Sequence, residues 1–221
     1  MARASSRSRF ARLGKVFADG RSPLLDALAQ MSVLYEDLRI ETFAIASSDE
    51  ELRRLDYLNS KYRVNYFLRR SVATLLEFEG ALHQLSRTSE YKAARDKTDR
   101  GLIKNVSDAI RFFQSNHKLF KSLRNDLGGH FSHEAAAFAT RHIEPDVTAN
   151  LEVTFHPSGK GGGAKLHYAG EIAATAFTKS LPGVKPRAEE IKDVIRAIRD
   201  GYAHATRAMH SLVIAFLWDR F

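Results

Sequence analysis

The chain has 221 residues, of which 44% are hydrophobic and 27% are charged, a composition typical of one globular domain or of two small ones. It contains no cysteine, which excludes disulfides, thiolate zinc sites, iron–sulfur clusters and a cysteine nucleophile and is compatible with a reducing cytoplasm. No run of about 18 apolar residues predicts a membrane span, and residues 1–21 lack the apolar core of a secretory signal. We therefore expect a cytoplasmic protein without membrane association.

The net charge of +8 at pH 7 is concentrated at the N-terminus. Residues 1–21 hold six basic residues against Asp19 alone, so this segment carries +5 and the rest of the chain +3. We predict a basic, flexible arm over residues 1–21 and one helical domain over residues 22–221. The arm is either a solvated tail or a segment that contacts the phosphates of nucleic acid or anionic lipid.

Helical periodicity dominates the first two thirds of the chain, where no proline lies between Pro23 and Pro145. Ser22 followed by Pro23 is a helix start signal, and Ser48 and Glu51 have the spacing of a capping box. We expect helices over about residues 23–46, 48–85 with a kink near Gly80, 99–127, and 133–142.

The composition changes after Pro145. Residues 151–155 alternate apolar and polar side chains, residues 157–163 form a glycine-rich turn, and residues 164–168 return as a second strand. Residues 171–179 are helical again, and a last helix runs from about Arg187 to Trp218. Its apolar stripe contains Ile191, Val194, Ile195, Ile198, Tyr202, Ala205, Met209, Leu212, Val213 and Phe216. The expected fold is all-α, an up-and-down bundle of four or five long helices with a small β-hairpin insertion at about residues 150–168.

One face of the third helix combines apolar and polar residues. At 100° per residue, this face contains Val106, Ile110, Phe113, His117, Phe120, Arg124 and Leu127. The opposite side is basic, with Lys97, Arg100, Lys104, Arg111 and Lys118. An unpaired buried arginine costs several kcal/mol. Arg124 must therefore bind an anion, lie in an interface, or reach water where the helix ends.

The end of this helix carries a short motif. Arg124 and Asn125 are followed, after four further residues, by His130. An arginine, a polar residue and a histidine at this spacing, late in a helical chain, resemble the signature of the HEPN superfamily. The resemblance implies a HEPN-like fold over residues 22–221 and metal-independent endoribonuclease activity without a cofactor. It also implies a homodimer, and a defence or toxin–antitoxin setting with a protein antitoxin as partner.

The resemblance also assigns roles to the three residues. His130 would deprotonate a ribose 2′-hydroxyl, Arg124 would hold the phosphate, and Asn125 would orient one of them. Gly128 and Gly129 break the helix before His130, whereas the family motif continues on a helix. The alternatives are a non-catalytic HEPN-like interaction or dimerisation module and an unrelated helical domain.

Basic residues near the motif and on the second helix are the candidates for RNA binding. They are Lys118, Lys121, Arg63 and Arg70. In residues 62–70, aromatic and basic side chains interleave, a pattern that indicates either an RNA-binding surface or ordinary packing of an amphipathic helix. We also expect Glu77 or Glu79 to pair with an arginine of the third helix.

Several other signals are weaker. His130, His133 and His142 match no closed zinc pattern, so we expect surface histidines and no metal site. Residues 158–163 are rich in glycine but lead into a strand, which favours a hairpin tip over a phosphate-binding loop. The long stripe of the last helix is covered either by a two-fold partner in a homodimer or by the second helix of the same chain.

Overall fold

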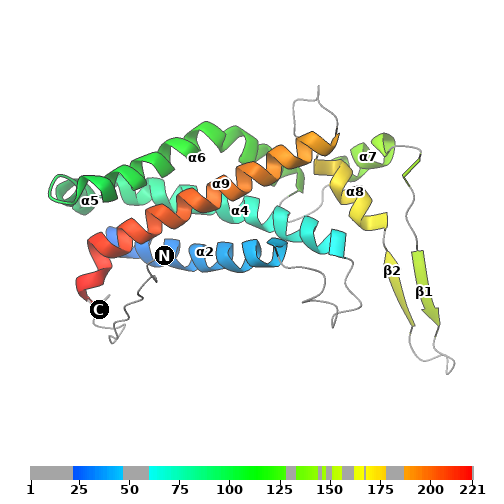
Figure 1. The fold of residues 1–221 in the computed structure, drawn as a ribbon, viewed down its shortest axis with the longest axis horizontal. Helices are drawn as coiled ribbons and strands as arrows, with labels where there is room; N and C mark the ends of the chain where they lie inside the picture. Colours follow the sequence, from blue (N-terminus) through cyan, green and yellow to red (C-terminus); the bar gives the residue numbers. More distant parts are fainter. Residues whose placement is uncertain are drawn as a thin grey trace, which may run out of the picture.

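The structure is a computed structural model that describes residues 22–46, 60–127, 133–143, 146–147, 151–155, 162–166, 168–177 and 187–220. The basic arm expected over residues 1–21 lies outside these residues. The described part is helical apart from two short strands, which confirms the all-α class. Its long helices are α2 (Pro23–Ala46), α4 (Ser60–Arg87), α6 (Arg100–Leu127) and α9 (Arg187–Leu212). They lie side by side along the long axis of the molecule, and each runs opposite to the one before it (Figure 1).

Two of these helices begin close to the residues expected from the sequence, and a side chain caps each start. The Ser22 hydroxyl accepts a hydrogen bond from the Leu25 amide at 3.3 Å, which confirms the start of α2. A carboxylate oxygen of Asp99 accepts from the amides of Gly101 at 2.7 Å and Leu102 at 3.2 Å, at the start of α6. Free amides at a helix start need such acceptors, so these local signals fix the helix boundaries.

The second helix differs from the expectation at its start. The structure describes α4 from Ser60 onward, and the predicted capping box at Ser48 and Glu51 lies outside the described residues. The helix passes through Gly80 without a break in its helical conformation. A further short helix, α5 (Ser89–Arg95), was not predicted. It is capped by Thr88, whose hydroxyl accepts from the Tyr91 amide.

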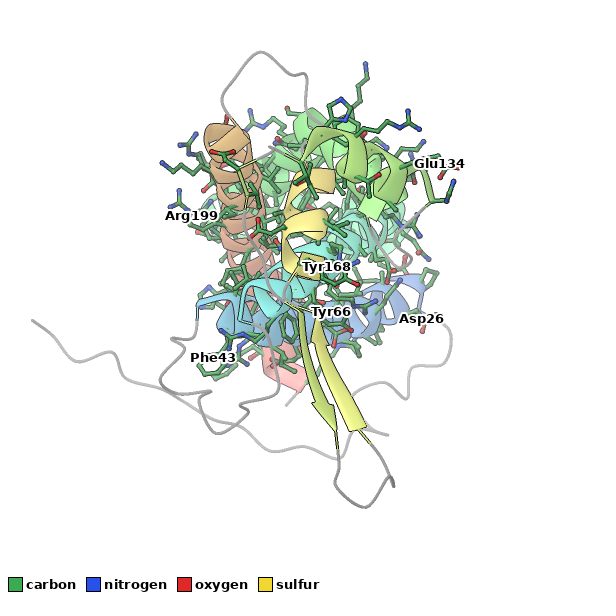
Figure 2. The ribbon with its side chains drawn as sticks, turned by 90° about the vertical axis from the view of Figure 1, so that its right-hand side faces the viewer. Asp26, Phe43, Tyr66, Glu134, Tyr168 and Arg199 are labelled. Carbon is green, nitrogen blue, oxygen red and sulfur yellow. The ribbon has the colours of Figure 1, made fainter. Side chains whose placement is uncertain are left out.

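One end of the molecule carries the shorter elements α7 (His133–His142), β1 (Leu151–Phe155), β2 (Gly162–Leu166) and α8 (Tyr168–Phe177). The strands pair antiparallel, with Leu151 opposite Leu166, and they project away from the helices (Figure 2). The return strand lies two residues earlier than the expected 164–168, because Tyr168 already belongs to α8. The bounds of α7 agree with the prediction.

Aromatic and aliphatic side chains fill the space between the long helices. Phe78 of α4 and Phe113 of α6 are fully buried, with their ring centroids 5.9 Å apart. Gly201 of α9 is also buried, and a Cβ at this position would lie 3.1 Å from a methyl carbon of Leu75. The missing side chain therefore allows α9 to approach α4 closely.

The last helix is covered mostly by its own chain. The side chains of Val194, Ile198, Ala205, Met209 and Leu212 are buried, and α9 contacts α2, α4 and α6. Beyond α9 the chain continues through a π-helical turn, η3 (Val213–Leu217), and a 3-10 turn, η4 (Trp218–Arg220). The Phe216 ring lies 6.1 Å from the Tyr91 ring. In the described part of the chain, other helices of the same chain therefore cover most of the apolar stripe of α9.

Candidate functional site

Arg124 and Asn125 lie in the last turn of α6, and both side chains are exposed. The buried side of this part of α6 contains Phe113, Phe120 and Leu123. Arg124 lies on the same face as Phe120, one turn further along and close to the end of the helix, and its side chain is exposed. No carboxylate among the described residues pairs with it. The arginine of the motif is therefore accessible to an anion.

His130 lies outside the described residues. The structure thus positions Arg124 and Asn125 of the predicted triad but not the histidine, and the convergence of the three side chains stays a prediction.

Basic residues continue along the same half of α6. Lys118 and Lys121 are exposed, and residues 111–127 contain four basic residues against one acidic residue, Asp126. In the first half of the helix, by contrast, Asp108 forms ion pairs with Lys104 and Arg111. Hydrogen bonding from Lys104 and then Arg111 lowers the pKa of Asp108. The second half of α6, which contains Arg124, therefore carries positive charge that the ion pairs of Asp108 do not compensate.

The two RNA-binding candidates of α4 lie in different environments. Arg63 is buried, with 8% of its surface exposed, so its guanidinium is not part of the exposed surface where we expected it. The Arg70 side chain is 49% exposed, and its Nε lies 4.0 Å from a carboxylate oxygen of Glu41. Tyr66 is exposed at the surface (Figure 2). The guanidinium of Arg69 lies over its ring, 5.9 Å from the ring centroid. An RNA contact through Arg70 stays a prediction, while burial argues against one through Arg63.

Glu41, next to Arg70, is a buried carboxylate of α2. The Thr74 hydroxyl donates a hydrogen bond to it at 2.9 Å. Burial raises the pKa of Glu41, and hydrogen bonds from Thr74 and Ser71 and the charge of Arg70 oppose that effect. The contacts of Glu41 with Thr74 and Arg70 connect α2 with α4, and the carboxylate compensates part of the positive charge of Arg70.

A histidine pair on a buried carboxylate was not predicted. Glu79 of α4 is 5% exposed, and one of its carboxylate oxygens lies 2.9 Å from Nδ1 of His117 on α6. Its other oxygen lies 3.8 Å from Nε2 of His83. The sequence predicts an arginine of the third helix as the partner of Glu77 or Glu79, whereas the partner of Glu79 on that helix is a histidine. One sequence signal could have indicated this pair, because His117 is a polar residue on the otherwise apolar face of α6 that also contains Arg124.

The other histidines of the described residues lie outside the motif and outside this pair. His133 and His142 are exposed, and the His142 ring stacks on Phe138. His204 stacks on Phe112, and its burial lowers its pKa. Within the described residues, no group of three or more His, Cys, Asp or Glu side chains has the arrangement of a metal site.

A cavity of about 570 Å³ lies elsewhere on the molecule, between α2, α6 and α9. Its lining includes Tyr35 and Glu36 of α2, Asn105 of α6 and Arg207 of α9. Asn105 precedes Arg124 by 19 residues, which corresponds to about 28 Å along the helix. The cavity is therefore separate from the motif.

Comparisons with known proteins give no relative: no family model, no curated protein and no solved structure matches the chain. Among the described helices, none combines the length and apolar character needed to cross a membrane.

Proposed function

We propose that the protein is a metal-independent endoribonuclease of HEPN type, with Arg124, Asn125 and His130 at its active site. The observation that carries the proposal is the exposure of Arg124 at the end of α6, without a paired carboxylate among the described residues. Guanidinium groups bind phosphate oxygens in a bidentate manner, and an accessible, uncompensated arginine is suited to that contact.

The arrangement of the long helices supports the fold part of the proposal. α2, α4, α6 and α9 run in alternating directions and surround one core, as in an up-and-down helical bundle (Figure 1). The motif begins on the third of these helices, at the end of the molecule that carries α7, α8 and the hairpin. We propose that this bundle is HEPN-like.

The proposed reaction is an intramolecular transesterification of RNA. His130 removes the proton of a ribose 2′-hydroxyl, and the 2′ oxygen attacks the adjacent phosphorus. The bond from phosphorus to the 5′ oxygen breaks, and the protonated histidine returns its proton to that oxygen. The products carry a 2′,3′-cyclic phosphate and a 5′-hydroxyl. Arg124 stabilises the charge that builds on the phosphate oxygens, while Lys118 and Lys121 hold neighbouring phosphates.

Incubation of the purified protein with total RNA tests this function. We expect cleavage that persists in EDTA and falls by about 10²–10⁴-fold in His130→Ala, the typical loss when acid–base catalysis is removed. Arg124→Ala should lose activity without losing helix content in circular dichroism, because its side chain is exposed. Arg111→Ala is the matched control on the same helix. Cleavage that requires a divalent metal, or that is unchanged in His130→Ala, contradicts the assignment.

A second candidate is a non-catalytic HEPN-like module that dimerises or binds a protein such as an antitoxin. Exposed apolar residues of α2 favour it: Val33 and Ile40 are 64% and 63% exposed and lie two turns apart on one face. Light scattering of the wild type and of Ile40→Glu distinguishes a homodimer that forms through this face from a monomer. A mass near twice 24.8 kDa that the substitution halves supports dimerisation through this face. A wild-type mass near 24.8 kDa excludes the homodimer.

A further inference from the structure

The cavity between α2, α6 and α9 has the size and the apolar lining of a small-molecule site. Its volume of about 570 Å³ falls within the range of about 300–1,000 Å³ that is usual for such sites. The apolar part of the lining consists of the Tyr35 ring, the buried Met209 side chain and Val213 of η3. The Tyr35 ring stacks on the Tyr202 ring with a centroid distance of 6.5 Å, a contact that holds it at the cavity wall. A ligand can therefore bury an apolar body against a preformed surface.

The polar groups around this cavity leave an excess of positive charge. Arg207 and His210 of α9 line the cavity, both are exposed, and neither has a hydrogen-bond or ion-pair partner among the described residues. The acidic residue of the lining, Glu36, is already paired, because Nη1 of Arg39 lies 2.9 and 2.8 Å from its two carboxylate oxygens. The charge that remains available to a ligand is therefore the guanidinium of Arg207.

We propose that this cavity binds a small carboxylate that has an apolar body. The carboxylate accepts hydrogen bonds from the guanidinium of Arg207 and from the imidazole of His210, which are neighbours on the helix surface because they are three residues apart. The apolar body lies against Tyr35, Met209 and Val213 and removes their surface from water. A cationic ligand of the same shape is repelled by Arg207.

Ligands of one shape and different charge provide the sharpest test. Calorimetry on the full chain compares 4-phenylbutanoate with 4-phenylbutanamide, in which an uncharged amide replaces the carboxylate, and with the cation 4-phenylbutylamine. We expect the carboxylate to bind about tenfold or more tightly than the amide, because hydrogen bonds between charged groups are strong, and we expect the amine to bind most weakly. No binding of the carboxylate at millimolar concentration, or binding of the amide or the amine that is as tight, overturns the proposal.

Acetate separates the contribution of the apolar body from that of the charge. It carries the same carboxylate as 4-phenylbutanoate but has almost no apolar surface to bury. We expect acetate to bind at least about tenfold more weakly, because the removal of apolar surface from water drives binding in a site with an apolar lining. Acetate that binds as tightly as 4-phenylbutanoate indicates general attraction of anions to the protein surface and overturns the proposal.

A matched pair of variants on α9 places the carboxylate in the cavity. Arg207→Gln should abolish the preference for the carboxylate over the amide and leave the affinity for the amide unchanged. Arg199→Gln removes the same charge about two turns earlier, where the arginine is paired with Asp200 at 3.4 Å and does not line the cavity, so its affinities should equal those of the wild type. Both arginines are exposed, so neither variant should change Tm. A preference that survives in Arg207→Gln, or equal losses in the two variants, overturns the proposal.

His210→Ala tests the second donor of the site. We expect the affinity for 4-phenylbutanoate to fall by about 2- to 10-fold, the usual contribution of one hydrogen bond. An unchanged affinity removes the imidazole from the site and overturns the binding of the carboxylate by two donors.

The result is independent of the proposed function, because the cavity is separate from the motif at the end of α6. Binding of 4-phenylbutanoate with the expected charge preference, without any RNA cleavage by the wild type, refutes the ribonuclease and leaves the site. Cleavage without binding of the carboxylate refutes the site alone.

Discussion

Two glycines in helix interiors allow a controlled test of the packing between α4 and α9. Gly80 is an exposed residue of α4, and a Cβ built there meets no atom within 4 Å. Gly201 is a buried residue of α9, where a Cβ would lie 3.1 and 3.2 Å from the two terminal carbons of Leu75. The same substitution, glycine to alanine, is therefore made once into open space and once into a filled core.

The expected effects have opposite signs. Alanine in place of a glycine in a helix interior gains about 0.5–1 kcal/mol. For a chain of this length, Gly80→Ala should raise Tm by about 1–4 °C. In Gly201→Ala the same gain is offset by overpacking, which costs about 1–3 kcal/mol in a filled core. Leu75 is fully buried and has little room to move. We expect a net loss on the order of 1 kcal/mol and a fall in Tm of about 2–4 °C.

Thermal unfolding followed by circular dichroism measures both variants under the same conditions. The reasoning is refuted by a Gly201→Ala protein that is as stabilised as Gly80→Ala, since α9 would then not approach α4 at Leu75. A destabilised Gly80→Ala protein would contradict the exposed, helical position of that residue in α4.

Three further predictions concern electrostatics and packing. Burial raises the pKa of Glu41 above its unfolded value, so the stabilisation from the protonated carboxyl is full below the unfolded pKa and is lost as pH rises through the folded pKa. Glu41→Gln should therefore raise Tm at pH 7, and the difference in Tm from the wild type should vanish when melting is measured toward pH 4. Phe113→Ala should lower the free energy of unfolding in urea by about 3–5 kcal/mol, because the fully buried ring contacts Phe78, and a loss below about 1 kcal/mol would contradict that core. Removal of residues 1–20 should weaken RNA binding chiefly at low salt and change Tm little, and a large fall in Tm would show that the arm stabilises the domain.

Helix boundaries are the part of the fold that local sequence specifies best. Ser22 accepts a hydrogen bond from a free amide at the start of α2, and the sequence predicted this cap because proline follows the serine. The start of α6 was predicted within one residue, and its cap by Asp99 is seen in the structure. The short α5 was missed because seven residues are too few to show helical periodicity, although Thr88 provides a cap.

The environments of the site residues depend on tertiary contacts between helices, which helical periodicity alone does not predict. Arg124 shares a helical face with Phe113, but it lies near the end of α6, where that face is no longer covered. The pairing of His117 with Glu79 joins residues 38 positions apart and depends on which sides of α4 and α6 meet. The burial of Arg63 is likewise set by tertiary packing and not by its spacing from Arg70.

Cleavage of a defined single-stranded RNA oligonucleotide, with analysis of the product ends, tests the ribonuclease proposal most directly. We expect a 2′,3′-cyclic phosphate on one product and a 5′-hydroxyl on the other, in the presence of EDTA. A single 2′-deoxy substitution at the cleaved nucleotide should abolish cleavage there, because the nucleophile is then missing, and His130→Ala should give no products above background. Cleavage at the deoxy position, or products with 5′-phosphate ends, would contradict the proposed mechanism.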